Sequence, residues 1–124
     1  MVIFYADDDG DDRELFAEAL NEVNPGIKLV LAANGHELIE LLEDQGGVPD
    51  FIFLDINMPV MSGKECLKAL RKVDRLRSVP IIMYTTTSNK EEFKNLVLLG
   101  AAGCVVKGIS FKAIKDSLRS ILAE

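Results

Sequence analysis

Each of four short apolar runs in the sequence is followed by a side chain that can bind a cation or an anion. In chain order these are the carboxylates of Asp7 and Asp8, the carboxylate of Asp55, the hydroxyl of Thr85 and the ammonium of Lys107. Neighbouring carboxylates repel one another unless a cation neutralises them, and Mg²⁺ prefers oxygen ligands. Lysine and threonine side chains can both hold phosphoryl oxygens. Brought together, these residues would suit phosphoryl transfer to a carboxylate.

The elements that must position these residues alternate between short apolar runs and helical patterns. The apolar runs predict five strands, at residues 2–6, 27–32, 51–54, 81–84 and 104–106. Four of the runs are continuously apolar, which indicates strands covered on both faces, as in a parallel sheet. The second run contains Lys28, so we expect it near an edge.

Between the strands, apolar residues recur at helical spacing and predict five helices. The stripes are Leu15, Phe16, Ala19, Leu20 and Val23; Leu38, Ile39, Leu41 and Leu42; Cys66, Leu67, Leu70 and Val73; Phe93, Leu96 and Val97; and Phe111, Ile114, Leu118 and Ile121. Ser62 with Glu65 has the pattern of a capping box, and Asn34 with Glu37 resembles one.

Strict alternation of strand and helix predicts an α/β fold. We expect a flavodoxin-like, doubly wound, five-stranded parallel sheet of order 2-1-3-4-5 with five helices. Ligands of such sheets bind beyond the carboxyl ends of the strands. The polar residues that follow the first, third, fourth and fifth strands should therefore converge on one crevice.

Composition and charge argue against several classes of protein for this chain. With 124 residues, 13.7 kDa and 48% hydrophobic residues, the chain predicts a single domain spanning 1–124. A net charge of −6 without a basic stripe argues against direct nucleic-acid binding. No apolar run approaches the roughly 20 residues of a membrane span, and the start lacks a signal pattern, so we expect a cytoplasmic protein. Cys66 and Cys104 are interpreted as buried small hydrophobes and His36 as a solvated side chain.

Several of the acids have a simpler structural explanation. Asp9, Asp11 and Asp12 stand near a helix start, where acids cap the helix or are solvated. Asp55 is different, because it directly follows four apolar residues and Ser62 already caps the next helix. We therefore predict a functional role for Asp55.

The pattern of Asp7-Asp8, Asp55 to Pro59, Thr85 and Lys107 resembles the receiver domain of two-component response regulators, over essentially the whole chain. The resemblance implies that Asp55 is a phosphoacceptor for a sensor histidine kinase or a phosphotransfer protein. It also implies that Thr85 and Lys107 contact the phosphoryl group.

The resemblance further implies a Mg²⁺ site. Asp8 and Asp55 would be direct ligands, Asp7 would act mainly through water, and Asn57 would supply its backbone carbonyl. We expect no output domain after the fifth predicted helix, so the chain resembles a single-domain, chemotaxis-type receiver. Its target would bind the face made by the fourth helix, fifth strand and fifth helix, where the helical wheel turns Leu98 outward.

Two residues depart from the family pattern. Gly108 follows Lys107 where proline is frequent, so we expect a trans peptide and a less firmly held lysine. Cys104 stands where an aromatic residue is frequent. The switch would then act through Thr85 and the loop that begins with Thr86 and Thr87, without an aromatic rotamer.

Other functions remain open at this stage. A degenerate receiver could act as a docking module without phosphorylation. An aspartate-nucleophile phosphatase would use Asp7 of Asp7-Asp8-Asp9 as its nucleophile. A flavin carrier shares the fold alone, and the acids of the first loop would repel its phosphate. We favour a switch that is not an enzyme beyond assisting its own phosphorylation and dephosphorylation.

Overall fold

A computed structural model describes residues 1–86 and 88–123. Five parallel strands form one sheet in the order β2-β1-β3-β4-β5. The strands are β1 (Val2–Ala6), β2 (Lys28–Ala32), β3 (Phe51–Leu54), β4 (Ile81–Thr85) and β5 (Gly103–Val106). The predicted fold class, strand order and edge position of β2 are confirmed.

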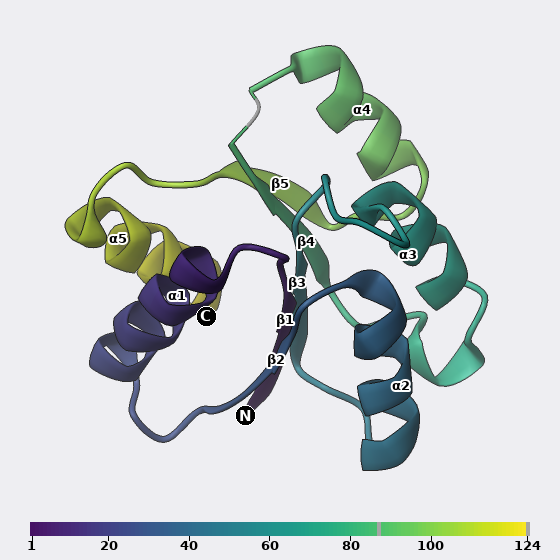
Figure 1. The fold of residues 1–124 in the computed structure, drawn as a ribbon, viewed down its shortest axis with the longest axis horizontal. Coiled ribbons are helices and arrows are strands. Elements are labelled where there is room, and N and C mark those ends of the chain that lie inside the picture. Colours follow the sequence, from purple (N-terminus) through teal and green to yellow (C-terminus); the bar gives the residue numbers. More distant parts are fainter. Residues whose placement is uncertain (87, 124) are drawn as a thin grey trace.

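Helices cover both faces of the sheet (Figure 1). They are α1 (Gly10–Val23), α2 (Gly35–Gln45), α3 (Gly63–Leu70), α4 (Lys90–Leu98) and α5 (Phe111–Leu122), with a short 3₁₀ helix η1 (Asp74–Leu76) after α3. α1 and α5 lie together on one face, and α2, α3 and α4 lie on the other. None of the helices in the described part of the chain has the length and apolar character needed to cross a membrane.

Each face of the sheet has its own apolar core. On one face Tyr5, Phe16 and Phe53 pack together, and on the other Phe4, Ile52 and Leu67 do so. Central strands supply side chains to both cores, which explains why their sequences are continuously apolar. Cys66 is fully buried, as predicted, whereas Cys104 is only partly buried.

Two members of the predicted apolar stripes face solvent. Leu15 of α1 is 41% exposed and Val97 of α4 is 50% exposed, so the prediction that both face inward is wrong. Both stand at the margin of their stripe, and the neighbouring Phe16 and Leu96 occupy the core positions. The predicted outward position of Leu98, which is 78% exposed, is confirmed.

Arg71, directly after α3, forms hydrogen bonds to the segments that precede β4 and β5. Its guanidinium donates hydrogen bonds to the carbonyl oxygens of Gly100 (2.9 Å), Leu76 (2.9 Å), Val79 (2.8 Å) and Arg77 (3.3 Å). Gly100 has a φ of 113°, a conformation that favours glycine, and a Cβ there would meet the Arg71 side chain. The connections before β4 and β5 are therefore fixed to the end of α3.

Candidate functional site

Three carboxylates meet at the carboxyl ends of β1 and β3. Asp7 and Asp8 follow β1 and Asp55 follows β3, and one oxygen from each lies within 4.8 Å of the others. Asp7 and Asp55 are buried and Asp8 is exposed. Because β1 pairs with β3, the sheet itself brings these acids together, as the sequence predicted.

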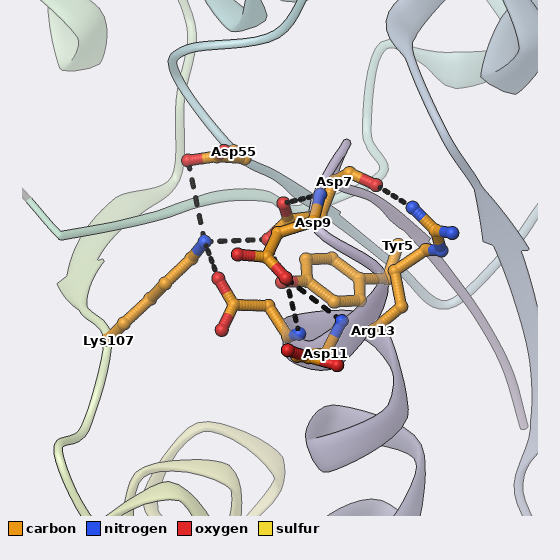
Figure 2. Close-up of polar contacts among 8 residues, drawn as sticks. Tyr5, Asp7, Asp9, Asp11, Arg13, Asp55 and Lys107 are labelled. Carbon is orange, nitrogen blue, oxygen red and sulfur yellow. Dashed lines mark hydrogen bonds and ion pairs between the residues drawn. The ribbon is translucent and has the colours of Figure 1, made fainter.

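Hydrogen bonds fix the carboxylate of Asp7. Its Oδ2 accepts from the Tyr5 hydroxyl and from the Lys107 ammonium (2.6 Å), and its Oδ1 accepts from the Asp9 backbone N–H (2.9 Å) (Figure 2). Arg13 also donates to the Asp7 carbonyl oxygen (2.7 Å). Burial and the bond to Asp7 both raise the pKa of Tyr5, which therefore remains a hydrogen-bond donor.

Asp55 keeps an unfavourable charge. Its side chain is 10% exposed, and burial, with the nearby negative charge of Asp7, raises its pKa to about 6. Lys107 lowers this pKa, but it does not cancel the other two effects, since its Nζ lies 3.8 Å from Asp55 Oδ1. A carboxylate in this condition favours a cation or a covalent partner that removes its isolated charge.

Lys107 lies among three carboxylates. Besides Asp7, its Nζ donates to Asp12 Oδ2 at 2.8 Å. Burial acts against the charge of Lys107, but the hydrogen bonds to Asp12 and Asp7 outweigh it and raise the pKa. The peptide to Gly108 is trans, as expected. The lysine is nonetheless firmly held, so the expectation of a loosely held Lys107 is wrong.

The loop after Asp55 folds back so that Gly63, at the start of α3, lies against the backbone of Asp55. Ser62 caps α3 with Glu65 in the predicted capping box, and Gly63 N–H donates to the Ile56 carbonyl at 2.8 Å. A Cβ at Gly63 would lie 2.2 Å from the backbone oxygen of Asp55. Earlier in the loop, Val60 has a φ of 70°, which is strained for a β-branched residue.

The remaining predicted residues lie at the same edge of the sheet. Thr85 is fully buried at the end of β4, and Asn57 is exposed two residues after Asp55. Thr87 lies outside the described residues. Cys104 lies beside Met83 of β4, and its thiol is 3.9 Å from the Phe93 carbonyl oxygen, so it links β5 to α4.

Sequence reasoning missed two residues of this site. Tyr5 precedes Asp7 by two residues, and side chains two apart in a strand point the same way, so its contact with the acids had a signal in the sequence. Asp12 was predicted to cap or face solvent. The capping residue is in fact Asp9, whose carboxylate accepts from the N–H groups of Asp11 and Asp12. Asp12 instead pairs with Lys107.

Residues 3–119 match the family model of the response regulator receiver domain. The chain belongs to this family. A receiver domain of this kind is a phosphorylation-dependent signalling switch, and no comparison favours the phosphatase, the flavin carrier or the docking module.

Chemotaxis proteins are among the relatives of this receiver. The chemotaxis protein CheY1 of Helicobacter pylori is 30% identical over 123 residues, which are 98% of this chain and 97% of that protein. The sensor histidine kinase CheAY of the same species is 30% identical over 109 residues, which are 88% of this chain but only 13% of the kinase. The structure of CheY4 of Vibrio cholerae is 30% identical, with a TM-score of 0.82 and 98% of each chain covered.

Proposed function

We propose that Asp55 of this receiver accepts a phosphoryl group from a sensor histidine kinase or phosphotransfer protein. An Asp55 oxygen would form a bond to phosphorus while the bond from phosphorus to the donor atom breaks, and the donor atom leaves with the electron pair. The observation that supports this best is the raised pKa of a buried Asp55 beside Lys107 and two further acids.

The acids also suit a Mg²⁺ ion. Among the described residues no hydrogen bond reaches the Asp8 carboxylate, which is exposed, so both its oxygens are available as ligands. Both oxygens of Asp7 already accept hydrogen bonds, which supports its role through water. We propose Asp8, Asp55 and the Asn57 carbonyl as direct ligands. When bound, the ion would neutralise the acids and polarise the incoming phosphoryl group.

The chain's own residues would orient the transfer. Lys107 would hold a phosphoryl oxygen, since its Nζ is already 3.8 Å from Asp55. Thr85, buried at the end of the neighbouring strand, would hold another. Asp7 cannot serve as a phosphatase nucleophile, because its carboxylate is buried and bonded to Tyr5 and Lys107.

We propose that the signal reaches the face of α4, β5 and α5 through the loop after Thr85. Leu98, at the end of α4, and Val106, at the end of β5, are exposed apolar residues on these elements and would contact a downstream protein. Thr85→Ala should uncouple phosphorylation from binding of the downstream protein, whereas Cys104→Ser should not.

Three further properties stay predictions of the sequence. They are organisation as a single domain, a cytoplasmic location and the absence of other enzyme activity.

The test is intact-mass spectrometry after incubation with Mg²⁺ and acetyl phosphate. One phosphoryl group adds about 80 Da to an aspartyl phosphate. We expect this gain in the wild type and in the surface control Asp44→Asn, but not in Asp55→Ala or in EDTA. A gain that persists in Asp55→Ala would place the site elsewhere, and no gain in the wild type would favour a docking module.

A further inference from the structure

Lys107 divides its hydrogen bonds unequally among the three carboxylates around it. It donates to Asp7 at 2.6 Å and to Asp12 at 2.8 Å, whereas Asp55 at 3.8 Å is beyond hydrogen-bond distance. Figure 2 shows the lysine reaching in between Asp55 and Asp7. In the unphosphorylated protein the ammonium is therefore held mainly by Asp7, directly after β1, and by Asp12 of α1, not by Asp55.

We infer that Asp12 is a positioning residue that competes with the phosphoryl group for Lys107. This inference rests on the proposed phosphorylation of Asp55. On phosphorylation Lys107 would keep its bond to Asp7, release Asp12 and donate to a phosphoryl oxygen instead. The strength of the bond to Asp12 would therefore determine how readily Lys107 can donate a hydrogen bond to the phosphoryl group.

Burial decides which of the two acids is released. The Asp7 side chain is fully buried, so removing Lys107 would leave a carboxylate with no access to water and only its two other donors. The Asp12 side chain is 32% exposed, so water can replace the lysine there. Leaving a buried charge unpaired costs far more than hydrating a partly exposed one.

The position of Asp12 is fixed by its helix. Asp9 caps α1 and accepts from the Asp12 backbone N–H at 3.2 Å, so Asp12 stands in the first turn with its carboxylate toward the loop after β5. α1 packs against α5, which follows that loop. The pair between Asp12 and Lys107 is thus a direct link between two elements that the switch would loosen.

Charge also favours a change of partner for the Lys107 ammonium, from Asp12 to a phosphoryl oxygen on Asp55. An ammonium has three donors, of which Asp7 and Asp12 use two. A phosphoryl group on Asp55 would add a charge of about −1.5 to −2 and three acceptor oxygens close to Lys107. The two bonds hold Nζ 3.8 Å from Asp55 Oδ1, so the third donor does not reach that site until the ammonium moves. Asp12, a single partly hydrated carboxylate, is the weaker of the two groups that would then attract the ammonium.

The experiment compares initial rates of phosphorylation by acetyl phosphate with Mg²⁺ in Asp12→Asn, Asp12→Glu and Asp11→Asn, with wild type measured alongside. Asp11 is the matched control, since it lies in the same turn and its carboxylate forms no hydrogen bond or ion pair among the described residues. We expect Asp12→Asn to raise the maximal rate about three- to tenfold, because the lysine is freed for the transition state. Asp12→Glu should restore a rate close to that of the wild type, and Asp11→Asn should match it.

Equal rates in Asp12→Asn and Asp11→Asn, or a slower Asp12→Asn, would overturn the inference. A wild type that gains no phosphoryl group would instead overturn the proposed function. A crystal structure of the wild type with Mg²⁺ and beryllofluoride gives a test without substitutions. We expect the Asp12–Lys107 hydrogen bond to be broken and the Asp7–Lys107 bond kept, and an intact 2.8 Å contact to Asp12 would refute the transfer.

Discussion

Asp55→Asn should make the protein more stable at neutral pH, although it removes the proposed phosphoacceptor. Burial and the charge of Asp7 raise the pKa of Asp55 from its ordinary 3.8 to about 6. The folded state therefore binds a proton at Asp55 more tightly than the unfolded state does. The charged carboxylate lowers the stability of the wild type at pH values above 6, and an amide of the same shape does not.

The size of the effect follows from the same two pKa values. A difference of about two pKa units corresponds to about 3 kcal/mol in the free energy of unfolding, because one unit is worth about 1.4 kcal/mol. The advantage of Asp55→Asn should be complete above pH 6, diminish as the pH falls from 6 toward 3.8, and amount to about 0.5 kcal/mol at pH 4. Lys107 remains paired in the variant, since Asp7 and Asp12 are its hydrogen-bond partners.

Urea unfolding in EDTA at pH 7.5 and pH 4 measures this difference. Asp44→Asn is the control, because Asp44 is an exposed acid on α2, and its effect should stay within about 0.5 kcal/mol at both pH values. Adding Mg²⁺ should stabilise the wild type more than Asp55→Asn and narrow the gap. Equal stability of wild type and Asp55→Asn at pH 7.5, or an advantage as large at pH 4, would refute the assignment of an isolated buried charge to Asp55.

Three further substitutions test the supporting structure. Gly63→Ala should destabilise the protein by about 1–3 kcal/mol in urea unfolding and slow phosphorylation by acetyl phosphate, because its Cβ would displace the backbone of Asp55. Arg71→Met should cost about 2–4 kcal/mol in the same assay, since several carbonyl oxygens lose their donor; a loss below 0.5 kcal/mol, on the order of a surface change, would contradict this. Val60→Asn should raise the free energy of unfolding by about 1 kcal/mol, because asparagine tolerates a positive φ; no gain would argue against strain at this position.

Much of the fold was predictable because parallel strands leave a strong signal. The central strands are buried on both faces, so their sequences are unbroken apolar runs, and the side chains after them meet at one edge. The margins of the helices were harder. A helical period defines an apolar stripe, but whether Leu15 or Val97 at its border is covered depends on how each helix tilts against the sheet.

The acids of the site were predictable for the same reason, and the pairing of Lys107 was not. Sequence places Lys107 after β5 and Asp12 in a helix start, and each has an ordinary explanation alone. Their contact depends on how closely α1 and α5 pack, a distance that no local pattern encodes. The hydroxyl of Tyr5 had a local signal, but a tyrosine in a core strand is usually explained by packing.

The contact between Asp7 and Lys107 joins positions 100 residues apart, and this separation has a consequence for synthesis of the chain. A ribosome makes Asp7, Asp8 and Asp55 well before the lysine that offsets their charge, which comes 52 residues after Asp55. β5 and α5, which position this lysine, are made after the other elements of the receiver, and folding during synthesis proceeds from the N-terminus. A nascent chain that ends before β5 therefore has the acids without their internal cation, and under the proposed mechanism it would become competent to take up a phosphoryl group only after β5, Lys107 and α5 have been made.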